Sequence, residues 1–165
     1  MRSMAATVLT GFVLTAHAGL VRAQTPLVRA QTPTVACDLL TQDRVGQALG
    51  MPVGAGTPIA RPGTCQWFGK GKFATLTITL QRGDKTPVDQ FNAGKASKLA
   101  GVTAEPVSGV GDDAYYIYFS GTTRAGLGIV VKKGTSTFEI RVYGFPLDEG
   151  KTVGKSLAQD VAGKF

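Results

Sequence analysis

Histidine is almost absent from this sequence, and cysteine is rare. The 165 residues contain one histidine, His17, and two cysteines, Cys37 and Cys65. Because His17 lies in an N-terminal segment that we expect to be removed, the mature chain has no histidine, which excludes Ser-His-Asp and Cys-His catalysis and the usual zinc sites. If the cysteines pair, no thiolate nucleophile remains. We therefore predict a protein that is not an enzyme and has no catalytic residue, metal or cofactor.

Acidic residues are also few, and this limits the kinds of catalysis that need no histidine. The chain has 11 Asp and Glu residues against 18 Lys and Arg residues, a formal net charge of +7. Glycoside hydrolases use a pair of carboxylates, and the candidates here are Glu105, Glu139, Glu149 and scattered aspartates. Since Glu139 is two residues from Arg141 on one face of an expected strand, a surface ion pair is favoured there. A carboxylate-based glycan hydrolase is the less favoured alternative.

The positive charge is spread along the whole chain. Only Lys70 with Lys72, and Lys132 with Lys133, lie close together in the sequence. Such scattering is typical of a solvated protein surface rather than of a basic binding patch. We therefore expect no nucleic-acid partner.

The N-terminus has the pattern of a secretory signal peptide, which we predict over residues 1–23. Arg2 supplies the positive charge, and the apolar run from Ala5 to Ala16 is of signal-peptide length and too short to span a membrane stably. No second apolar segment follows, so we expect no transmembrane segment after signal removal and a periplasmic or secreted location. The small-residue cleavage pattern fits after Ala18, Ala23 or Ala30.

A heptapeptide is repeated near the expected cleavage sites. Leu20–Pro26 is copied without change as Leu27–Pro33. A seven-residue unit copied once does not predict a solenoid, which needs longer units in several copies. We predict a flexible leader over residues 24–36 and a single globular domain over residues 37–165.

The two cysteines favour one disulfide, because an exported chain folds in an oxidising compartment. The alternative is a lipid-modified Cys37. Thr34-Val35-Ala36-Cys37 lacks the leucine that a lipobox carries three residues before its cysteine, and lipidation would leave Cys65 as a free thiol. We therefore predict a Cys37–Cys65 disulfide and do not expect lipoprotein anchoring through Cys37.

Capping residues and hydrophobic periodicity predict three helices and about five strands, in the order α-β-β-α-β-β-β-α. Thr41 and Gly50 bound the first helix, Thr86 and Gly101 the second, and Asp148 caps the last. Short connections make successive strands antiparallel, which gives an α+β fold with helices on one face of the sheet. The expected strands are 65–68, 75–80, 114–119, 127–131 and 138–143.

Residues 106–113 are predicted to form a glycine-rich loop. Its glycines and Ala114 imitate a dinucleotide-binding fingerprint, but that motif needs a following helix to receive the pyrophosphate, and here a strand follows. Asp112 and Asp113 are too few for a Ca²⁺ site, since the ion takes about six to eight oxygen ligands. We favour a structural role, in which one aspartate caps a loop amide.

Four aromatic residues crowd the strand that follows this loop. Tyr115 and Phe119 point to one side with Ile117, and we expect this set to face the core. Tyr116 and Tyr118 point to the other side, where they either pack under a helix, which is favoured, or line a ligand surface. The ligand surface we expect in the second case comprises Tyr116, Tyr118, Asp112, Asp113 and Arg141.

Several short motifs together resemble a family of small exported bacterial domains of unknown function. The family includes actinobacterial secreted lipoproteins and is similar to the extracellular sensor part of some bacterial receptor kinases. The resemblance covers most of residues 37–162. It implies a Cys37–Cys65 pair and an extracytoplasmic location but no reaction, and this chain departs from the lipoprotein members in its lipobox. The motifs are Cys37-Asp38-Leu39-Leu40-Thr41, Val45 with Leu49-Gly50, Cys65-Gln66-Trp67 and Gly109-Val110-Gly111-Asp112-Asp113-Ala114-Tyr115.

These observations favour a non-catalytic, exported binding module whose ligand is unidentified. We expect it to present a sheet face to a small ligand, an envelope polymer or a protein. The alternative partner is an envelope protein, to which an inhibitor or structural protein would bind by surface contact. Inhibitors of basic lysozymes are expected to be acidic, so the positive net charge weakens that version of the alternative.

Overall fold

The fold is α+β with one antiparallel sheet, as the sequence predicts. The computed structural model describes residues 35–71, 74–81, 86–120 and 126–165, and the predicted signal peptide and most of the predicted leader lie outside these ranges. The helices are α1 (Val35–Asp38), α2 (Gln42–Leu49), α3 (Thr86–Lys95) and α4 (Leu147–Ala162). None of these described helices is long and apolar enough to span a membrane. The strands are β1 (Thr57–Pro58), β2 (Thr64–Phe68), β3 (Thr75–Gln81), β4 (Val102–Val107), β5 (Asp113–Phe119), β6 (Leu127–Lys133) and β7 (Ser136–Tyr143).

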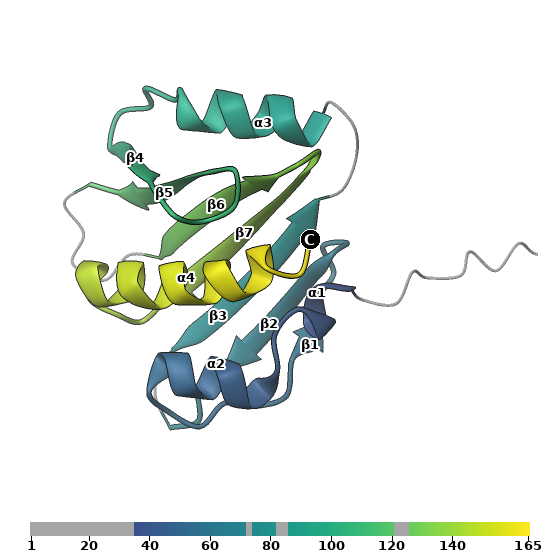
Figure 1. Cartoon of the computed structure of the whole chain (residues 1–165). Coiled ribbons are helices and arrows are strands. Elements are labelled where there is room, and N and C mark those ends of the chain that lie inside the picture. The colour runs from purple at the N-terminus through teal and green to yellow at the C-terminus, as the bar shows by residue number, and fades with distance from the viewer. Residues whose placement is uncertain (1–34, 72–73, 82–85, 121–125) are drawn as a thin grey trace, which may run out of the picture. The chain divides into compact units, whose positions relative to one another are not determined.

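The sheet is assembled from two groups of strands that are consecutive in the chain. Its order is β1-β2-β3-β7-β6-β5-β4, and every neighbouring pair is antiparallel (Figure 1). The first group is β1 to β3 and the second is β4 to β7. They meet where β3 pairs with β7, from Thr75 opposite Tyr143 to Gln81 opposite Thr137. This long-range pairing joins the two groups of strands into one sheet.

The described chain has seven strands and four helices, so the prediction of about five strands and three helices is wrong. The missed strands, β1 and β4, are the two edges of the sheet. Each contains a proline, Pro58 or Pro106, which lacks a backbone N–H and is tolerated at a sheet edge. The proline also interrupts the residue pattern by which a strand is recognised in a sequence. Pro106 is in addition the first residue of the predicted glycine-rich loop. The missed helix α1 has four residues, too few for a periodic pattern.

The main core lies between one face of the sheet and helices α1, α2 and α4 (Figure 1). We call this side the core face. Ile78 of β3 lies opposite Ile140 of β7, and neither has any exposed surface. The last helix contributes Val153, Leu157 and Val161, which are all buried, as their spacing predicts.

Helix α3 packs on the opposite side, which we call the outer face. Phe91 of α3 meets Tyr115 of β5 edge-on, with 5.1 Å between ring centroids. Lys95 Nζ donates to both carboxylate oxygens of Asp113 at 2.7 Å. The prediction that the helices cover only one face is therefore wrong, because β5 carries aromatic residues on both faces and both need cover. The helix also ends at Lys95 instead of near Gly101.

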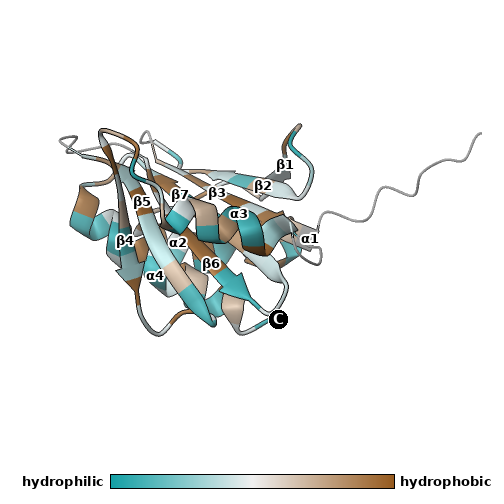
Figure 2. Cartoon of the chain, turned by 90° about the horizontal axis from the view of Figure 1, so that it is seen from above, coloured by the Kyte–Doolittle hydropathy of each residue, from teal (hydrophilic) through white to brown (hydrophobic). Residues whose placement is uncertain are grey.

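Strand β6 is covered on both faces, and its sequence is therefore apolar on both faces. Ile129 points to the core face and is fully buried, whereas Val130 points to the outer face and is half-buried. Figure 2 shows β6 as hydrophobic along most of its length and hydrophilic at its end, where Lys132 and Lys133 lie. Lys132 Nζ lies 5.9 Å from the ring centroid of Phe91, so the end of β6 also contacts α3.

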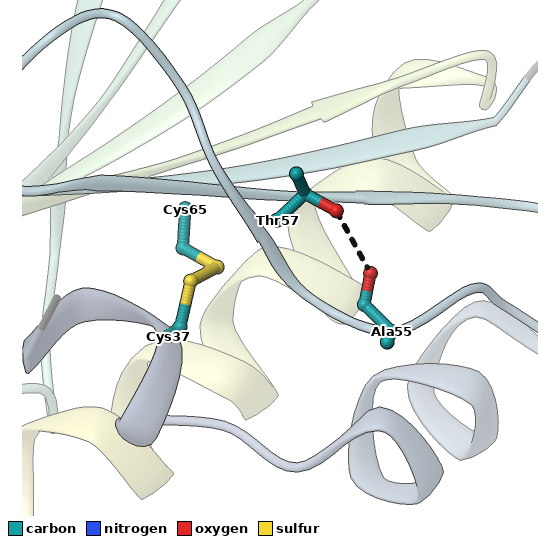
Figure 3. Close-up of a disulfide and its surroundings, with 4 residues drawn as sticks. All are labelled: Cys37, Ala55, Thr57 and Cys65. Atoms are coloured by element: carbon teal, nitrogen blue, oxygen red, sulfur yellow. Dashed lines mark hydrogen bonds between the residues drawn. A yellow bond between two sulfur atoms is a disulfide. The ribbon is translucent and has the colours of Figure 1, made fainter.

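The Cys37–Cys65 disulfide joins α1 to β2, as the sequence predicts (Figure 3). The two Cα atoms are 5.1 Å apart, and the bridge spans 28 positions of the chain. Beside it, the hydroxyl of Thr57 donates to the carbonyl of Ala55 at 3.4 Å. Because Cys65 is fully buried, the bridge fixes the N-terminal turn against the core. Such a bond fits an exported protein, since disulfides persist in oxidising compartments.

Helix α2 begins and ends where its sequence predicts. The hydroxyl of Thr41 accepts a hydrogen bond from the backbone N–H of Arg44 at 3.2 Å, which caps the first turn. Gly50 ends the helix in the left-handed conformation, with φ of 64°. Local chemistry therefore determines both ends of this helix.

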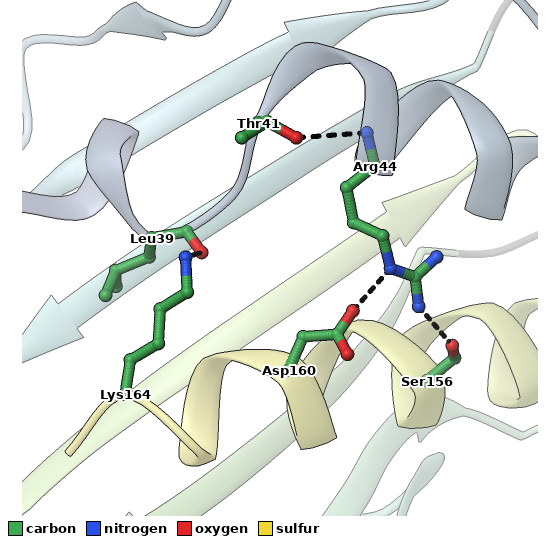
Figure 4. A network of polar contacts seen from close by, with 6 residues as sticks. All are labelled: Leu39, Thr41, Arg44, Ser156, Asp160 and Lys164. Atoms are coloured by element: carbon green, nitrogen blue, oxygen red, sulfur yellow. Dashed lines mark hydrogen bonds and ion pairs between the residues drawn. The ribbon is translucent and has the colours of Figure 1, made fainter.

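Polar contacts join this N-terminal part of the chain to α4 (Figure 4). Arg44 donates from Nε to Asp160 Oδ2 at 2.5 Å and from Nη2 to Ser156 Oγ at 2.7 Å. Lys164 Nζ donates to the carbonyl of Leu39 at 2.7 Å. These bonds hold the helices of the core face together on the side away from the sheet.

Replacing both cysteines, Cys37→Ser with Cys65→Ser, should lower the free energy of unfolding by about 3–4 kcal/mol on the chain-entropy model. The thermal midpoint should fall by roughly 10 °C. Circular dichroism melting of the mature protein measures this effect. Reductant should bring the wild-type midpoint down to that of the double variant and leave the variant unchanged. Equal midpoints without reductant would contradict a stabilising role for the bridge.

Candidate functional site

The five residues that the sequence marks as a ligand surface lie in separate places. Asp112, just before β5, accepts from Lys133 Nζ at 2.8 Å and from the backbone N–H of Gly134 at 2.7 Å. These bonds from Lys133 and Gly134 lower the pKa of the Asp112 carboxyl. One aspartate therefore caps a loop amide, in the turn between β6 and β7. Asp113 instead faces α3 through its ion pair with Lys95.

Tyr116 and Tyr118 lie on the core face, near the first turns of α4. Tyr116 is buried, and its hydroxyl donates to the carbonyl of Lys151 at 3.0 Å. Tyr118 is half-buried and its hydroxyl donates to Glu105 Oε2 at 2.7 Å. The structure thus shows the pair packed under a helix. The predicted assignment of faces is wrong, because Tyr116 belongs to the main core and Tyr115 lies under α3. Strand β5 has aromatic residues on both faces, so its sequence does not indicate which face points to the main core.

Glu105, Tyr118 and Lys151 form a polar cluster where β4 and β5 meet α4. Lys151 Nζ donates to Glu105 Oε2 at 2.7 Å and lies 4.9 Å from the ring centroid of Tyr118. The hydrogen bond from Lys151, and then that from Tyr118, lowers the pKa of Glu105. Their bonds to Glu105 raise the pKa of Lys151 and of Tyr118. The three side chains satisfy one another, so we assign the cluster a structural role.

The uncovered part of the outer face is the candidate functional site. Helix α3 covers part of this face, against β4, β5, β6 and part of β7, while the other described helices pack on the core face. A groove of about 530 Å³ remains over β2, β3 and β7, and we call it the open groove. Among its lining residues are Gln66 and Phe68 of β2, Thr75, Thr77 and Thr79 of β3, Arg141 and Tyr143 of β7, and Ile59 and Arg61 between β1 and β2.

Strand register places polar groups side by side along this groove. The hydroxyls of Thr64 and Thr79 are 3.3 Å apart across β2 and β3. Neighbouring strands also put Thr77 between Gln66 and Arg141. Side chains of a strand alternate between its two faces. Leu76, Ile78 and Leu80 of β3 point to the core face, so Thr75, Thr77 and Thr79 point to the outer face.

A second cavity of about 200 Å³ lies between the outer face and α3, and we call it the α3 cavity. It shares Arg61, Thr79 and Arg141 with the open groove, so the two adjoin at these residues. The part of its wall formed by α3, β5 and β6 is mainly apolar, although Gln90 of α3 also lines it. The apolar residues of that part are Phe91, Tyr115, Ile117 and Val130.

Two arginines and one carboxylate carry the charge of the site. Arg141 Nε donates to Glu139 Oε1 at 2.7 Å, an ion pair that the sequence spacing favours. Burial acts to lower the pKa of Arg141, but the Glu139 carboxylate and the Tyr143 hydroxyl outweigh it and the net shift is upward. Arg61 is exposed and has no ion pair among the described residues. The charge of Glu139 is balanced by Arg141, so Arg61 leaves the site positive.

This arrangement can bind an anionic group. Guanidinium groups bind carboxylates and phosphates through paired N–H donors. Threonine hydroxyls can donate or accept beside them. Within the described ranges, no group of three or more His, Cys, Asp or Glu side chains could hold a metal ion.

Sequence analysis found Arg141 but missed Arg61 and the threonines. The alternation of Thr75, Thr77 and Thr79 with buried residues does indicate a half-exposed strand, but it does not tell whether a helix covers the exposed side. Arg61 lies in a segment rich in glycine and proline that has no periodic pattern. It reaches the groove because the chain turns back beside β3, where the N–H of Leu80 donates to the carbonyl of Gly63 at 2.8 Å.

Comparison with known proteins adds no functional assignment. No protein-family model matches the chain, and no curated protein matches it significantly. The resemblance to exported bacterial domains therefore stays a prediction. What the protein binds has to be inferred from the geometry of its outer face.

Glu105→Gln should lower the free energy of unfolding at about pH 7 by roughly 0.2–1 kcal/mol, because the ion pair with Lys151 is partly exposed. The pKa of Glu105 is lowered in the folded state, so the stabilisation is present above the ordinary glutamate range and is lost as the pH falls through the folded value. Urea unfolding should therefore distinguish the two proteins near pH 7 and no longer near pH 2.

The matched control is the same substitution in a Lys151→Gln background. There the effect of Glu105→Gln should be smaller, because the charge partner is gone. An equal effect in both backgrounds near pH 7 would contradict the ion pair as its cause.

Proposed function

We propose that the protein is an exported, non-catalytic binding module that holds a small organic anion in the open groove. The observation that carries this proposal is Arg61, an exposed guanidinium with no ion pair among the described residues, on the same groove as Arg141. Arginine pairs with carboxylate and phosphate more specifically than lysine does, because its donors form a planar fork. Export is supported by the signal-peptide pattern and by the disulfide.

The neutral polar residues of the groove complement this charge. Thr77 lies between Gln66 and Arg141, and Thr79 lies between Thr64 and Glu139. Hydroxyl and amide groups can bond the remaining polar atoms of an organic anion and orient it. Charge complementarity therefore favours an anion over a neutral or cationic molecule of the same size.

The other two functions have less support from this face. Of the described residues that line the two cavities, Glu139 alone carries a carboxylate, and it is bonded to Arg141. Glycoside hydrolysis usually needs two carboxylates that flank the bond to be broken. An envelope protein is kept as the alternative occupant, and it becomes the favoured one if small anions do not bind.

Titration of ¹⁵N-labelled protein with benzoate, phenyl phosphate and benzamide tests the proposal. An anion held in the groove should shift the backbone amide signals of Thr75–Thr79 and Arg141, and neutral benzamide, which has the shape of benzoate, should not. Arg61→Gln should weaken anion binding at least tenfold, since a hydrogen bond to a charged group contributes about 1.5–3 kcal/mol.

Lys98→Gln is the matched control, because Lys98 is an exposed cation that lines neither cavity. This variant should bind as the wild type does. Equal weakening in both variants would mean that net charge, and not this site, attracts the anion. The relative affinity of benzoate and phenyl phosphate tells whether the site prefers a carboxylate or a phosphate. If neither anion shifts the groove signals, the proposal is wrong and an envelope-protein partner is favoured.

A further inference from the structure

We propose further that the α3 cavity receives an apolar tail of the same ligand, so that the ligand is an amphiphilic anion such as a medium-chain alkyl carboxylate. This inference rests on the proposed function, because it takes the anionic group to lie at Arg61 and Arg141. The inference adds the chemical nature of the rest of the ligand, an apolar tail, and its position, the α3 cavity.

The polarity of the cavity walls carries the inference. The wall shared with the open groove holds Arg61, Arg141 and Thr79. The wall beneath α3 holds mainly aromatic and aliphatic side chains, beside Gln90, with Tyr115 and Val130 directly opposite each other on β5 and β6. A molecule with its charge at the arginines therefore meets a mainly apolar surface on the side of the cavity towards α3. An amphiphile matches this arrangement, and a compact polar anion does not fill it.

The volume sets the size of the tail. An apolar cavity of about 150 Å³ is enough to hold a benzene-sized group. The α3 cavity, at about 200 Å³, therefore has room for roughly six carbon atoms. Removal of apolar surface from water should strengthen binding by about three- to fourfold for each methylene that enters.

The packing of α3 explains why the cavity lies under the first half of the helix. Pro87 and Phe91 line it, whereas Gly94 and Lys95 do not. At Gly94 the helix lies so close to the sheet that a Cβ would overlap the hydroxyl of Tyr115. The ion pair between Lys95 and Asp113 holds the same end down. The helix is thus closest to the sheet at its end and leaves space at its beginning, next to the arginines.

The test measures the affinity of the mature protein for acetate, hexanoate, octanoate and neutral 1-octanol, by the same amide shifts, below the micellar concentration. Affinity should rise at least 30-fold from acetate to octanoate, and octanol should bind more weakly than octanoate. Octanoate, but not acetate, should also shift the amide signals of Ile117 and Val130.

Two variants locate the tail. Val130→Phe fills the α3 cavity, so octanoate should bind no more tightly than acetate, while acetate binding should stay within about twofold of wild type. Ile117→Phe fills it from the neighbouring strand and serves where Val130→Phe does not fold, as judged by its thermal midpoint. Phe68→Gln tests the other path for the tail, along the open groove, because Phe68 lines that groove, is 56% exposed and does not line the α3 cavity. It should leave the chain-length dependence unchanged.

The outcomes separate this inference from the proposed function. If acetate and octanoate bind equally and both depend on Arg61, the anion site stands and the tail is wrong. If octanoate binds tightly but Phe68→Gln abolishes the chain-length dependence and Val130→Phe does not, the tail lies along the open groove and the inference is overturned. If octanol binds as tightly as octanoate, or if no carboxylate binds, the inference is overturned, and the proposed function fails with it only if phenyl phosphate does not bind either.

Discussion

The pairing of β3 with β7 is the constraint on which both faces of this protein depend. It joins two strands that are separated in the chain by the whole of α3, β4, β5 and β6, and it runs unbroken from Thr75 to Gln81. The register sets Ile78 against Ile140 on the core face, and the same register sets Thr77 against Arg141 and Thr79 against Glu139 on the outer face. A slip of one residue would exchange the faces and put threonines in the core. The register that the apolar core requires therefore also fixes which side chains line the groove.

The helices cover the two faces unequally, and this is what leaves a groove. The core face is closed by α1, α2 and α4, and the disulfide and the bonds of Arg44 tie these helices to the sheet and to each other. On the outer face α3 is held beside β5 by Phe91 and Lys95 and does not extend over β2. The helices that close the core thus lie on the face opposite to the surface that we propose as the binding site.

Sequence alone predicted the features that local chemistry decides. Thr41 and Gly50 bound α2, alternation identified β3 and β7, and cysteine count with an export signal predicted the disulfide, because each depends on residues close in the chain or on composition. The edge strands were missed, since Pro58 and Pro106 break the pattern that marks a strand. The candidate site was mostly missed for a different reason. Arg61 and Arg141 share one groove only through strand order, and neither periodicity nor spacing encodes that order.

Threonine explains how a face of this sheet stays stable without a helix over it. The branched Cβ of Thr75 and Thr77 suits a pleated strand as well as valine does, while their hydroxyls keep this half-buried surface hydrated. Valine at these positions would leave an apolar patch that needs a covering element or a partner. The fold is therefore complete with the groove empty, so that a ligand can enter and leave without unfolding any element. A surface that needed its occupant for stability would suit a permanent partner. The stability of this surface without an occupant fits the reversible binding of a small molecule that we propose, and the same face supplies positive charge, hydroxyls and an adjoining, mainly apolar cavity.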